Sequence, residues 1–283
     1  MISKERQIWK KKGFRENLVT SLVLFLLVIA FLFPIVWTFL ISIKQTVDAL
    51  AMPPKLIFTP TIEHYLAVWG DGRFLHYGIN SLVVALGATL IGVALATPAA
   101  YIFARYRTRA HKYLLFSILS TRMIPHVTFM IPFFIIFSRL RLIDTYVAII
   151  LMHLTIILGF VIWLMRSYFY EIPRELEEAA LADGCSHFQS FLLVVLPVAT
   201  PGLATSAIFS FIYSWNEFLY ALIVTGITTK TIPLGIYNWV AWEEVHWGPL
   251  TATAMLALIP VVIFYSFVQK SLVRGLTMGA IKG

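Results

Sequence analysis

Three polar side chains interrupt long apolar runs of this 283-residue sequence: Arg122, Asn216 and Glu217. An arginine inside a bilayer is costly unless it is paired or faces water, so Arg122 is a candidate functional residue. One hypothesis is that Arg122 lines a cavity and binds an anionic group, because a guanidinium donates two parallel hydrogen bonds to a sulfonate or carboxylate. The alternative is a structural pair with Glu217 or with carbonyls freed near Pro125.

Asn216 and Glu217 are good hydrogen-bonding groups for the hydroxyls of a polar ligand. A polar contact between two helices in the membrane explains them equally well. The histidines and the single cysteine, Cys185, show no spacing typical of a metal site. We therefore predict substrate-pathway roles for Arg122, Asn216 and Glu217, with no catalytic residue and no metal ligand.

A second group of chemically informative residues lies between residues 166 and 197. Pro173 suits the first turn of a helix, and Gly184 suits the position just past a helix end. Three glutamates fall in that first turn, where carboxylates complement the helix dipole: Glu175, Glu177 and Glu178. The pattern predicts a short acidic helix of about ten residues, a glycine turn, and an apolar helix that enters the membrane at Pro197.

The elements that must position these residues are membrane spans. Hydrophobic residues make up 59% of the chain and charged residues 13%, against about 45–50% and about 25% in soluble domains. The formal net charge of +8 does not indicate nucleic acid, because the basic residues lie between apolar runs, as they do in membrane loops. We predict an all-α membrane protein.

Six apolar stretches are long enough to cross a bilayer, for which about 20 residues are needed. The third contains Arg122. The six are Leu18–Ile43, Leu75–Ala104, Tyr113–Ser138, Tyr146–Met165, Val198–Val224 and Pro249–Val268.

The distribution of basic residues orients these spans. With both termini in the cytoplasm, cytoplasmic segments hold fifteen of the 22 Lys and Arg residues and external segments hold six, the remaining one being Arg122. This agrees with the excess of positive charge on the cytoplasmic side of membrane proteins. The bias is weaker if the third stretch does not cross, so the six-span arrangement is favoured. It places the loop 166–197 in the cytoplasm.

That loop resembles a signature of importer permeases of the ATP-binding-cassette class. The family pattern is Glu-Ala-Ala, three residues, Gly, nine residues, Ile, one residue, Leu-Pro. The sequence has every position at this spacing, with valine in place of isoleucine: Glu178, Ala179, Ala180, Gly184, Val194, Leu196 and Pro197. The whole chain is similar to the six-span, MalG-type permeases of carbohydrate importers, and the resemblance implies the type I importer permease fold.

The resemblance also implies partners and a mechanism. A second homologous permease subunit, two ATPase subunits and a periplasmic or extracellular solute-binding protein would complete a sugar importer in the bacterial inner membrane. Glu178 would pair with a basic residue of an ATPase. The same ATPase-coupling surface would include Asp183, the adjoining Gly184 and Leu196-Pro197, with Gly275 and Lys282 of the C-terminal tail.

No Gly-x-x-x-x-Gly-Lys nucleotide loop occurs in the sequence. We therefore expect the chain to be a transporter subunit without cofactor or enzymatic activity, with ATP and Mg bound by the ATPase partners. The expected organisation is a cytoplasmic tail at 1–17, a transmembrane domain at 18–270 that includes the coupling loop 166–197, and a cytoplasmic tail at 271–283.

Two other classes of protein fit the residues less well. An ion-driven secondary transporter or channel requires carboxylates in several spans, and Glu217 is the sole strong candidate. A membrane-embedded enzyme requires histidines and carboxylates clustered at one site, and the sequence shows no such cluster.

Overall fold

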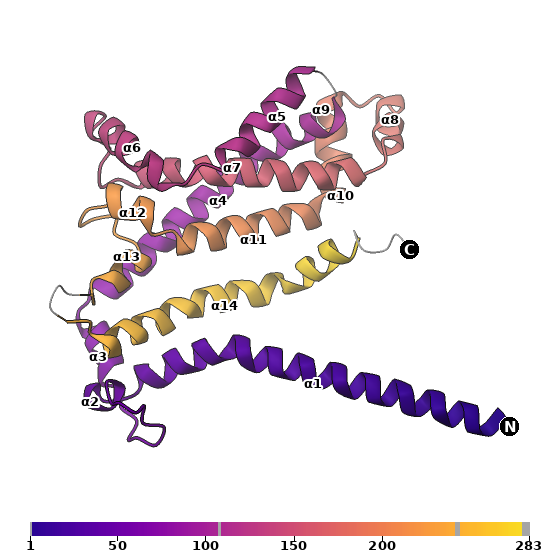
Figure 1. Ribbon diagram of the computed structural model, residues 1–283. Helices are drawn as coiled ribbons and strands as arrows, with labels where there is room; N and C mark the ends of the chain where they lie inside the picture. Colours follow the sequence, from indigo (N-terminus) through magenta and orange to yellow (C-terminus); the bar gives the residue numbers. More distant parts are fainter. Residues whose placement is uncertain (1, 107–108, 241–243, 279–283) are drawn as a thin grey trace. The chain divides into compact units, whose positions relative to one another are not determined.

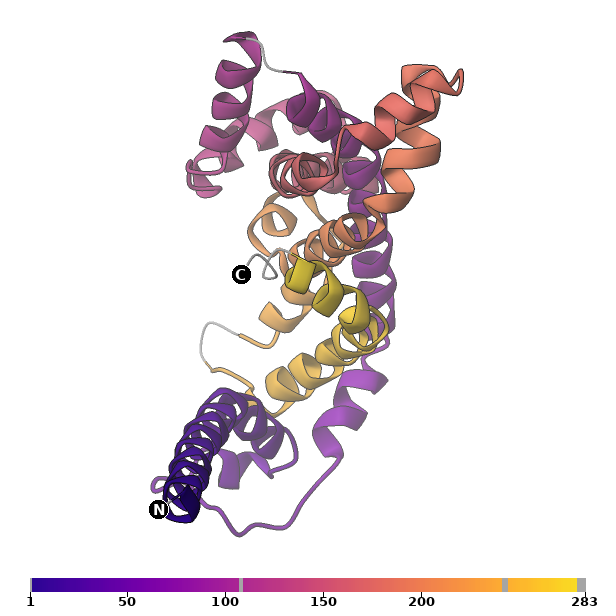
Figure 2. The ribbon, with the colours of Figure 1, turned by 90° about the vertical axis from the view of Figure 1, so that its right-hand side faces the viewer.

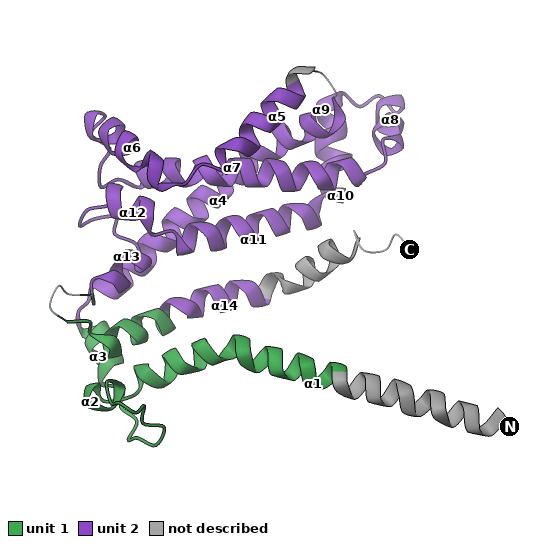
Figure 3. Cartoon of the chain, viewed as in Figure 1, with its two compact units in different colours: residues 1–70, 239–256 green, residues 71–238, 257–283 purple. Residues whose placement is uncertain are grey.

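The structure is a computed structural model that describes residues 2–106, 109–240 and 244–278, with side chains described for 20–106, 111–240 and 244–266. The chain divides into two compact units, coloured separately in Figure 3. Unit 1 comprises residues 1–70 and 239–256, and unit 2 comprises residues 71–238 and 257–283. The predicted division at residues 17 and 270 concerns topology and stays a prediction.

Unit 1 contains the long first helix, the segment that follows it to residue 70, and residues 239–256. Its helices are α1 (Ile2–Ser42), α2 (Thr46–Ala49), α3 (Glu63–Gly70) and the beginning of α14 (Trp247–Met278). Every side chain from residue 20 to residue 36 of α1 is exposed. Since nearly all of these side chains are apolar, this part of α1 is suited to lipid or to another protein.

A buried lysine holds the segment after α1 in place. The Lys44 side chain donates to the Lys55 carbonyl oxygen at 2.5 Å. Its ammonium also lies 5.3 Å from the ring centre of Trp37 and 4.9 Å from that of Phe58. Cation–π contacts of this length are stabilising, more so when the cation is withdrawn from water. The contacts tie the loop of residues 55–58 to the end of α1.

Unit 2 holds the remaining helices (Figure 1). In chain order they are α4 (Arg73–Arg105), α5 (Arg109–Thr121), α6 (Val127–Arg139), α7 (Tyr146–Glu171), α8 (Glu175–Ala182), α9 (His187–Ser190), the π-helix η1 (Phe191–Val195), α10 (Leu196–Val198), α11 (Thr200–Asn216), α12 (Leu219–Val224), α13 (Ile232–Tyr237) and the rest of α14.

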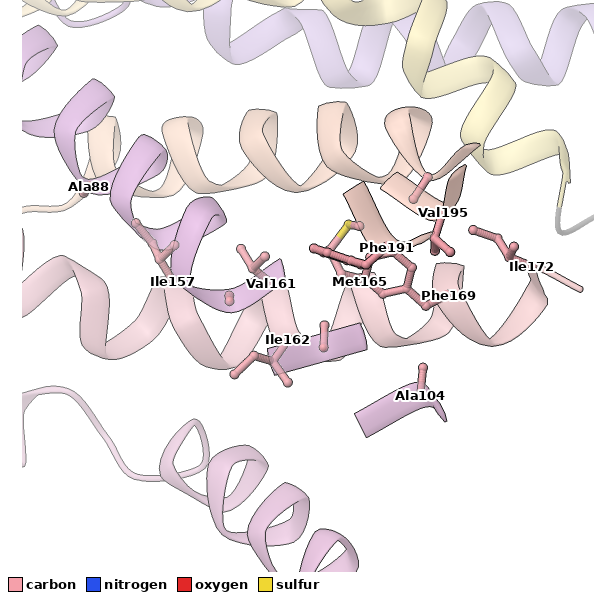
Figure 4. Close-up of a cluster of buried hydrophobic side chains, with 13 residues drawn as sticks. Ala88, Ala104, Ile157, Val161, Ile162, Met165, Phe169, Ile172, Phe191 and Val195 are labelled. Carbon is pink, nitrogen blue, oxygen red and sulfur yellow. The ribbon is translucent and has the colours of Figure 1, made fainter. Parts of the chain in front are cut away.

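The centre of unit 2 is formed by α4, α7 and α11 (Figure 2). Small residues on α4 face large apolar residues on α7, among them Ile157, Val161 and Met165 (Figure 4). A Cβ at Gly92 of α4 would lie 2.5 Å from the Ile157 side chain. Close approach through small residues is how helices associate in membranes, where burial from water adds no driving force. This packing sets the spacing of the helices that carry the candidate site.

Four helices are long and apolar enough to cross a membrane, and their bounds lie close to those of four predicted spans. They contain Thr20–Ser42, Arg73–Arg105, Tyr146–Glu171 and Trp247–Ser266. A pair of helices bent by 75°, His187–Val198 and Thr200–Asn216, meets the same criteria when taken together. The part of the chain that the structure describes therefore has four such helices, or five with the bent pair.

The third predicted span is not one continuous helix. The stretch Tyr113–Ser138 is divided between α5 and α6, and neither is long enough to span alone. Arg122 and Pro125 lie in the break between them. Proline lacks an N–H and disfavours helix in the residue before it, so α5 ends before Pro125 and α6 starts after it.

Candidate functional site

The acidic helix predicted after the fourth span is present as α8, and Gly184 ends it. Gly184 has a φ of +91°, a conformation that glycine adopts without strain. The Gly184 N–H donates to the Leu181 carbonyl oxygen at 3.1 Å, and the Cys185 N–H donates to the Ala180 carbonyl oxygen at 3.0 Å. These two bonds form a Schellman motif, which satisfies carbonyls at the helix end. A capping box between Ser186 and Gln189 then starts α9.

One of the three glutamates of α8 anchors the helix to α4. Glu177 forms an ion pair with Arg105, and its other carboxylate oxygen accepts from the Tyr101 hydroxyl at 2.8 Å. The Arg105 and Glu177 side chains are 7% and 13% exposed. Arg105 also donates to the Ile172 carbonyl oxygen at 3.0 Å, just before α8. No local pattern in the sequence indicates this pair, because the two residues are 72 positions apart.

The other face of α8 is open. Glu178, Ala179 and Asp183 are exposed, whereas Ala180 is buried. Exposed apolar side chains continue this face into the next segment, with Phe188 at 69% exposure. Of the other residues assigned to the coupling surface, Leu196 is half-buried, Pro197 is exposed, and Gly275 lies in α14 where the backbone alone is described. Lys282 lies outside the described residues.

Arg122 lies at the break between α5 and α6, where its side chain packs on α7. Its Cζ atom is 5.3 Å from the ring centre of Phe160, within the range of a cation–π contact. Its Cγ and Cδ atoms lie 3.5 Å from the position of a Cβ on Gly159. Within the described residues Arg122 has no carboxylate partner. The alternative in which Arg122 pairs with Glu217 is therefore not seen.

Two cavities meet at Arg122. The larger has a volume of about 230 Å³ and is lined by Thr121, Arg122, His126, Phe129, Phe133, Thr155, Ile156 and Tyr220. The smaller has a volume of about 130 Å³ and is lined by Arg122, Ile156, Ile157, Phe160, Phe209, Ser210 and Tyr213. Both are mostly aromatic and aliphatic with few polar groups, a composition typical of small-molecule sites.

Asn216 and Glu217 lie at the end of α11 but do not line either cavity. Asn216 is exposed and donates to the Ile212 carbonyl oxygen at 2.8 Å. Glu217 is buried and accepts from the backbone N–H groups of Tyr220 at 2.9 Å and Ala221 at 3.2 Å. Since a carboxylate that accepts these N–H groups stabilises the start of a helix, Glu217 stabilises the beginning of α12.

A buried histidine adjoins this carboxylate. The Nε2 atom of His153 is 3.4 Å from Glu217, and its Nδ1 atom is 2.6 Å from the Ser214 hydroxyl. His153 thus connects α7 to the end of α11 and to the break between α11 and α12. In the described part of the chain, no three His, Cys, Asp or Glu residues are grouped to hold a metal ion.

Comparison with protein families identifies this architecture. Residues 88–278 match the family described as "Binding-protein-dependent transport system inner membrane component". The chain belongs to this family. The match includes α8, Arg122 and the bent pair of helices, and the family description agrees with the several apolar helices of a multi-pass membrane protein.

Relatives cover nearly the whole chain. The chain is 38% identical over 267 residues to a probable ABC transporter permease protein, y4oR, of Sinorhizobium fredii, with 94% of this chain and 96% of the relative covered. It is 35% identical over 256 residues to the trehalose transport system permease protein SugB of Mycobacterium tuberculosis, with 89% and 93% covered.

A solved structure confirms the predicted fold. The chain aligns with a TM-score of 0.74 and 25% identity to a bacterial ABC transporter involved in the import of the acidic polysaccharide alginate, with 90% of this chain and 96% of that chain covered. The structure of the chain is thus that of an ABC importer permease. The two relatives above are named as permease proteins of transport systems.

Proposed function

We propose that this chain is a permease subunit of an ATP-driven sugar importer, in which it forms half of the translocation pathway. The observation that carries the proposal is the two-sided α8. Glu177 fixes one face of the helix to Arg105 and Tyr101 of α4, while Glu178 on the other face is exposed. A helix of eight residues is marginal alone, and its firm attachment to α4 lets a force on the exposed face move a membrane helix.

The exposed face of α8 is the proposed contact with an ATPase subunit. Glu178 would form an ion pair with a basic residue of the ATPase, and Asp183, Gly275 and Lys282 would extend the contact. ATP and Mg would bind to two ATPase subunits, since the sequence has no nucleotide-binding loop of its own. This chain would hold no cofactor. Both termini and α8 would lie on the cytoplasmic side of the inner membrane, as the excess of basic residues favours.

Glu178→Ala tests the coupling proposal, with Glu175→Ala as its matched control. Both glutamates are exposed on the first turn of the same helix. In the assembled transporter, Glu178→Ala should lower substrate-stimulated ATP hydrolysis at least about tenfold, since charge pairs at interfaces are worth several kcal/mol. Glu175→Ala should have little effect. Equal loss in both variants, or in neither, would contradict the assigned contact.

Sugar is proposed as the substrate class from the names of the relatives, since SugB is a trehalose permease and the aligned structure is an alginate importer. The solute would arrive from an external binding protein, in keeping with the family description. The larger cavity has about 230 Å³, less than the roughly 300 Å³ at which small-molecule sites begin. A second permease subunit would therefore complete the pathway.

A finer proposal is that the sugar carries an anionic group that binds Arg122. Arg122 has no carboxylate partner among the described residues and lies beside two aromatic cavities, so its guanidinium is suited to a sulfonate or carboxylate. Asn216, which is exposed, would contact sugar hydroxyls. The second candidate is a neutral sugar, with Arg122 held structurally by its contact with Phe160.

ATP hydrolysis by the reconstituted complex distinguishes the two candidates. Neutral sugars are compared with sulfonated and uronic sugars, in the unmodified chain, in Arg122→Gln and in the control Arg139→Gln, an exposed arginine at the end of α6. Stimulation by the anionic set alone, lost in Arg122→Gln and kept in Arg139→Gln, would support an anionic substrate. Stimulation by neutral sugars that survives Arg122→Gln would overturn it.

A further inference from the structure

The loop between α12 and α13, residues 225–231, is held by a carboxylate from another part of the chain. Asp144, in the turn before α7, accepts hydrogen bonds from the N–H groups of Gly226 at 2.8 Å, Thr228 at 3.0 Å and Thr229 at 2.9 Å. It also accepts from the Thr229 hydroxyl at 2.8 Å. The Asp144 N–H donates to the Val224 carbonyl oxygen at 2.8 Å. One aspartate therefore fixes most of the loop.

Side chains of α4 bind backbone carbonyl oxygens of the same loop. The Asn80 amide donates to the carbonyl oxygens of Thr228 at 2.8 Å and Lys230 at 2.9 Å. The Tyr146 hydroxyl donates to the Asn80 Oδ1 at 2.6 Å, which orients the amide. The His76 ring makes a further bond of 2.8 Å with the Thr228 carbonyl oxygen. The loop is thus tied to α4 and to the start of α7.

The backbone of the loop also lies very close to the Asp144 carboxylate. A Cβ on Gly226 would lie 2.7 Å from the Asp144 Oδ2 atom, so glycine lets the loop backbone reach the carboxylate. The next residue, Ile227, is 90% exposed. A surface loop that only connects two helices needs no such network. A loop ordered before binding has less conformational entropy to lose when a partner contacts it.

We propose that Asp144 is a positioning residue that preforms loop 225–231, with Ile227 at its tip, as a contact for the external solute-binding protein. The proposal rests on the proposed function, which places α8 in the cytoplasm. Asp144 precedes α7 and α8 follows it, and Figure 1 shows α12 and α8 at opposite ends of unit 2. The loop then faces the compartment from which the binding protein delivers its solute.

The first test asks whether Asp144 orders the loop. In the purified full-length chain, the amide protons of Gly226, Thr228 and Thr229 should exchange at least about tenfold faster in Asp144→Asn, because the neutral amide loses a charge-assisted acceptor and turns a donor toward these N–H groups. Asp71→Asn is the matched control, an exposed external aspartate that pairs with Arg73. Unchanged exchange in Asp144→Asn would overturn the positioning role.

The second test measures how the assembled transporter responds to its solute-binding protein. In Asp144→Asn, the binding-protein concentration for half-maximal ATP hydrolysis should rise about tenfold, equivalent to about 1.4 kcal/mol. The maximal rate should fall much less than this. Asp71→Asn should leave both values unchanged. A lower maximal rate with an unchanged half-maximal concentration would indicate a merely structural role and would overturn the proposal.

Ile227→Ser tests the contact with the binding protein separately from the ordering of the loop. This change leaves the Asp144 network intact, so amide exchange should stay normal while the half-maximal concentration still rises. An unchanged half-maximal concentration in Ile227→Ser would contradict the contact. Fewer assembled complexes, with unchanged half-maximal concentration, would place the loop against the second permease and also overturn it. If the unmodified transporter shows no response to binding protein, the proposed function itself fails.

Discussion

Two carboxylates hold the chain at opposite ends of α7, and they do so by different chemistry. Glu177, after α7, is paired with the guanidinium of Arg105. Asp144, before α7, receives three backbone N–H groups and one hydroxyl, and no ion pair forms there among the described residues. An ion pair joins two helices through long side chains, whereas bonds to several N–H groups of one loop fix the path of its backbone.

The difference indicates what each end must do. At the end of α7 that leads into α8, a rigid helix has to move with α4. The ion pair of Arg105 with Glu177, with the bond from Arg105 to the Ile172 carbonyl oxygen, achieves this. At the Asp144 end a loop has to keep its shape, so the bonds are spread over Gly226, Thr228 and Thr229. Three measurements test this difference between the two ends of α7.

The largest effect should come from Arg105→Met. Removing one partner of a buried ion pair leaves the other charge uncompensated, which costs about 3–5 kcal/mol. The thermal unfolding midpoint in detergent should fall clearly, and α8 should become sensitive to protease. Arg174→Met is the control, since Arg174 makes an exposed bond to the Arg105 carbonyl oxygen and should cost about 1 kcal/mol. Equal effects would show that the pair is not what holds α8.

The pH dependence of the free energy of unfolding should reveal the contribution of Asp144. Burial raises the pKa of Asp144, but the bonds from Thr228, Thr229 and Gly226 outweigh it and hold the pKa below its usual value. A lowered pKa gives stability that is complete above about pH 4 and lost as the pH falls toward the pKa of the folded state. Asp144→Asn should therefore lose less stability than the unmodified chain between pH 5 and pH 3, by about 1.2 kcal/mol. If stability falls with pH equally in Asp144→Asn and in the unmodified chain, this expectation is contradicted.

The smallest effect should come from Gly184→Ala. Nothing lies within 4 Å of a Cβ at Gly184, so the cost arises only from its φ of +91° and should be about 1 kcal/mol. Gly184→Asn should cost less, since asparagine tolerates positive φ. The thermal unfolding midpoints of the two variants check that Gly184→Ala is the less stable. If Gly184→Asn is the more damaging, space and not backbone conformation limits this position.

Local signals predicted the α8 end well. Pro173, the glutamates of the first turn and Gly184 act within one helix and its turn, so the sequence was enough to predict a short helix that ends in a glycine turn. Their contacts were not predictable. Glu177 and Glu178 look alike in sequence, and Arg105, which distinguishes them, is 72 residues away from Glu177.

Other parts depended on distant contacts. The partners of Asp144 lie 82 to 85 residues further along the chain, so nothing near Asp144 identified it. The apolar stretch around Arg122 predicted a span, but the break at Arg122 and Pro125 divides it into two helices. Arg122 was predicted to face a cavity or a partner, and its contact with Phe160 could not be read from spacing.

The exposed apolar side chains of α1 have a consequence for biosynthesis. From residue 20 to residue 36 they are exposed, so this span can partition into lipid before the helices that follow it are synthesised. Its insertion would depend on its own hydrophobicity and on the basic residues that precede it. Polar substitutions on α1 should therefore reduce the yield of inserted protein, while the helices of unit 2, once made, keep their packing.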